Sequence, residues 1–156
     1  MDGRAGSNPE GAGLPRLFSP PHGPANPHES GLQCGIDLIE IPRIKEAVEQ
    51  WGDKFLHRVW TERELDYCRG RYPELAVRFA AKEATSKALG TGISGINWRE
   101  IEVVPGEGGR PSLYLHGAAR ERAESMGIHT WAVSLTHTGS LACAFVVAQA
   151  ASIQAE

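Results

Sequence analysis

The sequence is constrained most by one alanine-rich stretch, residues 78–92. Alanine, leucine, lysine and glutamate favour helices, and no proline falls between Glu74 and Gly90. Gly90 stands where a helix C-terminus favours a residue with positive φ. We therefore expect one long helix that starts at Glu74 and ends near Gly90.

This predicted helix has one unusual face. Ala80, Glu83, Ala84 and Lys87 recur at the spacing i, i+3, i+4, i+7, so they form one stripe. Alanines let another backbone come close, and this stripe also carries a carboxylate and an ammonium. One interpretation is an exposed Glu–Lys pair that adds about 0.3–0.5 kcal/mol to helix stability. The other is a functional site.

Length and composition restrict the class of protein. The chain has the length of one domain, and its net charge of -3 argues against a nucleic-acid binder. Cys34, Cys68 and Cys143 show neither a disulfide framework nor a metal-binding spacing, which indicates a reducing, cytoplasmic location. No apolar run has transmembrane length and no signal-peptide pattern is present, so we expect no membrane association.

Residues 1–30 differ in kind from the rest. They hold most of the ten prolines, with glycines interspersed and no apolar period. Such a segment cannot bury enough surface to offset its ordering entropy, which predicts a flexible extension. The folded domain is expected to span residues 31–150, followed by a C-terminal tail at residues 151–156.

The order of the predicted elements indicates an α+β fold. The first strand, residues 35–41, is apolar at both parities, so we expect both of its faces to be buried. Thr61 and Glu64 match a capping box that opens a helix reaching to about Arg69. A mainly antiparallel sheet around the long central helix suits this order. The other expected elements are helices 43–51, 54–59 and 118–125, a hairpin of strands 101–104 and 113–116, and strands 131–136 and 141–148.

Two carboxylates are the best candidates for chemistry. Asp37 lies in an apolar strand, where it either bonds to nearby backbone or has a functional role, because a buried charge is costly without a partner. Asp37 and Glu83, from separate elements, are the kind of oxygen ligands that hold Mg²⁺ together with phosphate oxygens. No Walker, zinc or serine-hydrolase motif accompanies them. The cationic and polar groups expected to bind phosphates are Arg78, Lys82, Lys87 and His137.

Three motifs together carry a family resemblance. Residues 35–44, 78–92 and 133–138 resemble, in order and spacing, holo-(acyl-carrier-protein) synthase, the short single-domain type of 4'-phosphopantetheinyl transferase. The resemblance covers about Leu32 to the end of the chain and implies the fold of that family. The N-terminal extension lies outside the family pattern, and Cys34 stands where a glycine is common.

The resemblance implies an activity and roles for particular residues. The enzyme would transfer 4'-phosphopantetheine from coenzyme A to a serine of apo acyl carrier protein, release 3',5'-ADP, and support fatty acid biosynthesis. Asp37 and Glu83 would hold Mg²⁺, Lys87 would stabilise the leaving group, and either Glu83 or a metal-bound water would accept the serine proton. The implied coenzyme A contacts are Arg78, Lys82, Lys87, Gly90, Thr91, Gly92, His137 and Thr138.

The family also implies partners and an assembly. It implies a homotrimer whose active sites lie between protomers. A carrier protein is acidic, so basic side chains of the first helical region are candidates for docking it. These are Arg43, Lys45, Lys54 and Arg58, although Glu46, Glu49 and Asp53 interrupt the patch. Two other classes stay open: another Mg²⁺-dependent phosphotransferase or hydrolase, and a non-catalytic module that binds coenzyme A or a nucleotide.

Overall fold

The structure of the chain is a computed structural model that describes residues 31–151. The predicted flexible extension at residues 1–30 and most of the predicted tail, residues 152–156, lie outside the described residues. Within residues 31–151, no helix has both the length and the apolar character needed to cross a membrane.

The strands form two antiparallel sheets. The larger sheet has the order β1 (Leu32–Glu40), β5 (Leu141–Ala150) and β4 (Ile128–His137), so β5 is central. The smaller sheet pairs β2 (Ile101–Pro105) with β3 (Pro111–Leu115). All described pairings are antiparallel. This confirms the predicted α+β class, although the strands are divided between two sheets.

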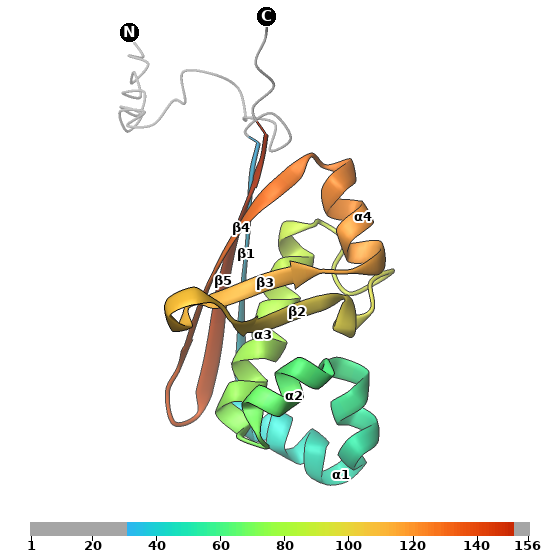
Figure 1. The fold of residues 1–156 in the computed structure, drawn as a ribbon. Coiled ribbons are helices and arrows are strands. Elements are labelled where there is room, and N and C mark those ends of the chain that lie inside the picture. Colours follow the sequence, from blue (N-terminus) through green and yellow to red (C-terminus); the bar gives the residue numbers. More distant parts are fainter. Residues whose placement is uncertain (1–30, 152–156) are drawn as a thin grey trace, which may run out of the picture.

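The central helix, α3 (Tyr72–Ala88), lies between these sheets (Figure 1). Its alanines Ala80 and Ala84 are fully buried. A Cβ atom placed on Gly35 of β1 would lie 1.8 Å from the backbone oxygen of Ala84, so only glycine fits this crossing. The alanine stripe therefore does admit another backbone, as the sequence predicted.

The remaining helices lie at the two ends of α3 (Figure 1). At one end are α1 (Ile41–Val59), which Gly52 interrupts with a φ of 54°, and α2 (Glu62–Cys68). The interruption falls between the two helices predicted there. The predicted capping box is confirmed, because Thr61 Oγ1 accepts a hydrogen bond from the Glu64 amide and the Glu64 carboxylate accepts one from the Thr61 amide. At the other end lies α4 (Gly117–Ser125).

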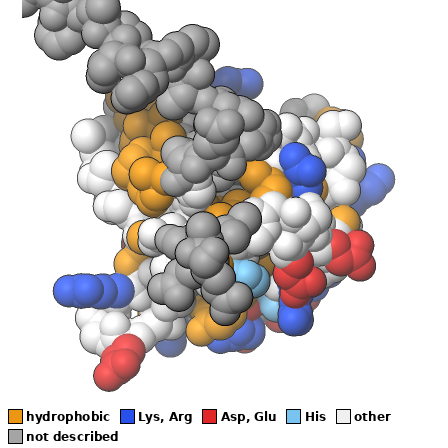
Figure 2. Space-filling model, turned by 90° about the horizontal axis from the view of Figure 1, so that it is seen from above, with side chains coloured by type: hydrophobic (Ala, Val, Ile, Leu, Met, Phe, Trp, Pro, Cys, Tyr) orange, Lys and Arg blue, Asp and Glu red, His pale blue; other side chains and the backbone are white. Residues whose placement is uncertain are grey.

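One face of the larger sheet has no cover within residues 31–151. Ile36 and Leu38 of β1 are 58% and 61% exposed, and Phe145, opposite Ile36 on β5, is 44% exposed. The prediction that both faces of β1 are buried is therefore wrong for the described part of a single chain, in which α3 covers only one of them. Figure 2 shows hydrophobic side chains (orange) reaching the surface on the left of a view from above. An apolar sheet face is left for another protein surface.

Candidate active site

A pocket of about 540 Å³ lies between β1, α1 and α3. Asp37 of β1 and Glu83 of α3 line it, together with the arginines Arg43 and Arg58. Asp37 reaches the pocket because Gly35, two residues earlier, brings β1 against α3. Glu83 reaches it because it follows the buried Ala80 by three positions on the helix. The pocket thus collects two carboxylates and two guanidinium groups.

Lys87 adds a positive charge next to these two carboxylates. Its Nζ donates to Asp37 Oδ1 at 3.1 Å and to the backbone oxygen of Ile36 at 2.8 Å. Partial burial raises the pKa of Glu83, the negative charge of Asp37 raises it further, and Lys87 opposes both effects. A bound cation would relieve the repulsion between the two carboxylates.

The chemistry of these ligands fits Mg²⁺. No cluster of three or more His, Cys, Asp or Glu suited to a metal occurs within residues 31–151. Mg²⁺ does not require such a cluster, because it is commonly held by one or two carboxylates plus water and substrate phosphates. Asp37 and Glu83 could fill that role if a phosphorylated substrate supplied the remaining oxygens.

Arg78 lines a different pocket, of about 670 Å³, between the β2–β3 loop and β4. Its guanidinium is almost buried: Nε donates to the Val103 oxygen at 2.9 Å and Nη1 to Glu74 Oε2 at 2.8 Å. The ring of Tyr67 lies 4.4 Å from the guanidinium carbon. Arg78 and Glu83 are five positions apart, which places them roughly 140° apart around the helix. One chain therefore divides the predicted site residues between two pockets.

The other predicted coenzyme A contacts lie in two turns. His137 and Thr138 stand exposed at the β4–β5 turn, where Thr138 Oγ1 accepts a hydrogen bond from the Leu141 amide at 3.1 Å. Because β5 separates β4 from β1, His137 at the end of β4 lies about two strand spacings, roughly 10 Å, across the sheet from β1. The other side of the turn is attached to the end of β1, since the Ile41 amide donates to the Ser140 oxygen at 2.8 Å. The segment Gly90, Thr91, Gly92 follows α3, and Gly90 has the expected positive φ, 72°.

Lys82 is buried and does not reach either pocket. It is fully inaccessible, and its Nζ donates to Glu64 Oε2 at 2.7 Å and to the backbone oxygens of Trp98 and Ile101. Burial lowers the pKa of this ammonium, whereas the nearby Glu64 raises it. The ammonium has no open path to a phosphate. This placement corrects the interpretation of Lys82 as a coenzyme A ligand.

The four basic residues predicted to dock a carrier protein have different surroundings. Arg43 and Arg58 line the pocket with the carboxylates. Lys54 and Arg58 line an adjoining pocket of about 280 Å³ beside Trp51, which is 58% exposed. Lys45 forms an exposed ion pair with Glu49, at 3.8 Å.

The sequence analysis did not identify the aromatic residues that form one wall of the pocket that holds Asp37 and Glu83, called here the carboxylate pocket. Phe79 and Trp98 stack there, with ring centroids 4.6 Å apart and planes 27° apart. Phe79 could have been found, since it lies four positions before Glu83 on the same side of the helix. Trp98 could not, because it stands in the short 3-10 turn η1 (Trp98–Glu100), where no hydrophobic period exists.

Three comparisons relate the chain to known proteins. The sequence profile of the 4'-phosphopantetheinyl transferase superfamily matches residues 33–146. A holo-[acyl-carrier-protein] synthase of Herpetosiphon aurantiacus is 54% identical over 123 residues, which cover 74% of this chain and 97% of that protein. The crystal structure of the Helicobacter pylori holo-[acyl-carrier-protein] synthase in complex with coenzyme A aligns with a TM-score of 0.68 at 31% identity, covering 74% of this chain and 99% of that one. The corresponding enzyme of Neisseria meningitidis aligns with a TM-score of 0.69 at 34% identity, covering 75% and 97%.

Proposed function

This chain belongs to the holo-[acyl-carrier-protein] synthase family of 4'-phosphopantetheinyl transferases, and we propose that it modifies acyl carrier protein in a Mg²⁺-dependent reaction of fatty acid biosynthesis. The 4'-phosphopantetheine group moves from coenzyme A to a serine of the apo carrier, and 3',5'-ADP leaves. The observation that supports these site residues is that Asp37 and Glu83 line one pocket and that Lys87 donates to Asp37 beside it.

The proposed mechanism relies on positioning and charge more than on covalent catalysis. Asp37 and Glu83 would hold Mg²⁺, which when bound neutralises charge on the pyrophosphate of coenzyme A. The serine oxygen forms a bond to the phosphorus that carries pantetheine, and the bond from that phosphorus to 3',5'-ADP breaks. The group that this chain offers to accept the serine proton is Glu83, and a water molecule at the site is the alternative. Lys87 stabilises the charge that develops on the departing phosphate.

The remaining coenzyme A contacts are proposed to come from two protomers. Arg78, His137 and Thr138 would bind the phosphates that do not react, and the backbone of Gly90, Thr91 and Gly92 would border the ligand. Arg78 and Glu83 lie on different sides of α3, so a single protomer does not bring both groups to one pocket. A second copy of the chain can supply the missing side.

The exposed sheet face supports a homotrimer as that assembly. Ile36, Leu38 and Phe145 form a continuous apolar strip across β1 and β5, and monomeric proteins rarely leave such strips open. A ring of three copies would bury this face by the same contact at each junction. It would also place the sites between protomers.

The carrier protein is proposed to dock beside α1. Arg43, Lys54 and Arg58 give this side a positive charge that complements an acidic carrier. Trp51, exposed between them, offers an apolar contact. Lys45 is a weaker candidate, because Glu49 already balances its charge. We also propose a cytoplasmic location, consistent with three cysteines that are all free thiols.

One experiment separates the proposed activity from its two alternatives. The protein is incubated with coenzyme A, Mg²⁺ and an apo acyl carrier protein, and the intact mass of the carrier is measured. A gain equal to phosphopantetheine supports the transferase. Hydrolysed coenzyme A with unmodified carrier indicates a hydrolase, and unchanged coenzyme A indicates a binding module. A carrier whose serine is replaced by alanine is the matched control.

A further inference from the structure

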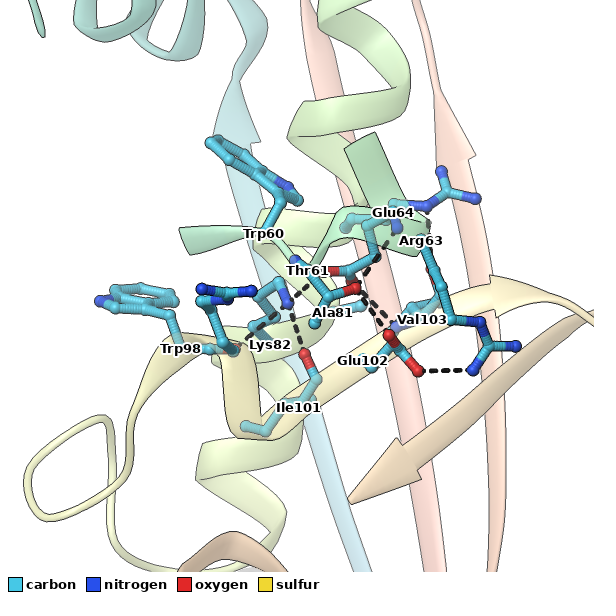
Figure 3. A network of polar contacts seen from close by, with 12 residues as sticks. Trp60, Thr61, Arg63, Glu64, Ala81, Lys82, Trp98, Ile101, Glu102 and Val103 are labelled. Atoms are coloured by element: carbon cyan, nitrogen blue, oxygen red, sulfur yellow. Dashed lines mark hydrogen bonds and ion pairs between the residues drawn. The ribbon is translucent and has the colours of Figure 1, made fainter. Parts of the chain in front are cut away.

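A buried polar network links α2, α3 and the start of β2, and the proposed mechanism does not use it (Figure 3). Lys82 and Glu64 lie at its centre, and both side chains are fully inaccessible. Glu64 Oε1 accepts the Val103 amide at 2.9 Å, and Oε2 accepts Lys82 Nζ and the Thr61 amide. Glu102 joins the edge of the network by accepting Thr61 Oγ1 at 2.6 Å.

The network holds the aromatic wall of the carboxylate pocket. Lys82 Nζ donates to the Trp98 backbone oxygen at 3.2 Å and also to that of Ile101, so the whole 3-10 turn is attached to α3. Trp98 faces the pocket with Asp37 and Glu83 and stacks on Phe79. In Figure 3 the ammonium of Lys82 points toward this segment. Moving Lys82 would therefore release a wall of the pocket.

The same network holds the second pocket through a single residue of β2. The Val103 amide donates to Glu64, and the Val103 oxygen accepts from Arg78 Nε at 2.9 Å. Arg78 has little freedom of its own, because Glu74 and Tyr67 hold its other side. The position of β2 relative to α3 thus fixes both Trp98 and Arg78.

We propose that Lys82 and Glu64 are positioning residues: their buried ion pair holds β2 and the turn η1 against α3, and so places Trp98 and Arg78, each at one of the two proposed coenzyme A-binding pockets. This inference rests on the proposed function only in assigning those pockets to coenzyme A. Neither residue touches substrate. Both act through Trp98, Val103 and Arg78.

Stability alone is a weak reason for such a pair. Burying two charges costs so much desolvation free energy that replacing a buried pair by apolar side chains of similar volume is often neutral or stabilising. An apolar pair would pack against the core but would remove the donor to the Ile101 oxygen and the acceptor of the Val103 amide, and would leave the Trp98 oxygen only the Ile101 amide. The charged pair gives an orientation of β2 that apolar packing does not.

The test compares the double variant Lys82→Met, Glu64→Leu with the wild-type protein. The double variant avoids the unpaired buried charge that either single change would leave. We expect it to unfold cooperatively, yet to show kcat/KM for coenzyme A at least tenfold below wild type, mainly through a raised KM. Ile128→Val and Ile128→Ala are the matched controls, because Ile128 is buried near α4 and lines neither pocket.

Of the two Ile128 controls, the one whose melting temperature is closer to that of the double variant is assayed beside it. The assay temperature lies below the melting temperatures of both proteins. An equal loss of kcat/KM in that control would overturn the inference, because loss of stability would then explain it. Hydrogen exchange gives a readout that needs no activity: residues 98–103 should exchange faster in the double variant while α3 stays protected. Unchanged exchange there overturns the inference, whereas a wild-type protein that modifies no carrier overturns the proposed function instead.

Discussion

At the scale of single residues, the surroundings that suit Glu83 to its proposed role at the metal site also lower the stability of the metal-free protein. Its pKa in the folded protein is raised above the ordinary value of 4.5, first by partial burial and then by Asp37. Between that value and the raised one, the folded state binds more protons than the unfolded state, so stability falls as pH rises through the window. Above that window Glu83 is ionised in both states, and its surroundings then destabilise the folded, metal-free protein.

The substitution Glu83→Gln should raise the melting temperature of the metal-free protein at pH 7, by a few degrees at most because the group is only partly buried. The gain should vanish well below pH 4.5, where Glu83 is protonated in both states. Thermal unfolding across pH in a chelator measures this. Glu49→Gln, which changes an exposed carboxylate, is the control. A gain that persists at low pH would show that charge is not the cause.

Asp37→Ala and Glu83→Ala should each lower turnover by at least about 100-fold, since changing even an outer partner of a metal ligand typically costs 10–100-fold. The fold should remain, because neither carboxylate lies in the buried core. Rates are measured over a Mg²⁺ titration, with circular dichroism as the folding check. Near-normal turnover at limiting Mg²⁺ would remove that residue from the metal site.

Several residue positions follow from local periodicity. Helical spacing predicts that Glu83 and Lys87 share a side of α3, and both lie near Asp37 as the structure shows. The partner of Lys82 was beyond such reasoning, because Glu64 is 18 positions away and belongs to another helix. The helical period predicts the face of the helix on which a side chain lies. Which residues cover that face depends on contacts between segments far apart in the sequence.

At the scale of elements, the crossing of β1 over α3 determines the site. The sequence predicted the alanine stripe and the helix end at Gly90, since both are local signals. It also predicted the break in α1, which glycine at position 52 makes possible by its positive φ. The start of α3 was placed two residues late, because Pro73 occupies the first turn of the helix and does not precede it.

Gly35→Ala should destabilise the protein by about 3 kcal/mol or more, because the new methyl group would overlap the Ala84 oxygen and force β1 away from α3. Turnover should fall as well, since β1 carries Asp37. Denaturant unfolding measures the loss. Gly139→Ala is the control, because no atom lies near its added Cβ, and it should change stability by less than about 0.5 kcal/mol. If the two variants had equal free energies of unfolding, β1 could shift away from α3 at no cost in stability, and the close crossing would not be required.

At the scale of the whole molecule, the open sheet face distinguishes one chain from its assembly. The sequence predicted two buried faces for β1, and residues 31–151 of one chain cover only one of them. The apolar residues of β1 predict that both faces are buried, but they do not identify the protein surface that covers each face. Leu38→Asp should therefore dissociate the assembly and leave a folded monomer, since Leu38 is 61% exposed in the single chain. Sedimentation gives the mass, and an unchanged mass would place the interface elsewhere.

The last prediction concerns how sites are shared in that assembly. Glu83→Ala and His137→Ala protomers, each badly impaired alone, should regain activity after they exchange subunits. If every site takes Glu83 from one chain and His137 from its neighbour, random mixing leaves both intact in about a quarter of sites, because each chain supplies its correct residue half the time. Activity near a quarter of wild type in the whole mixture, or near a third in rings verified by mass to contain both variants, fits sharing. No recovery in such rings would show that Glu83 and His137 serve the same chain, while the transferase chemistry would still stand.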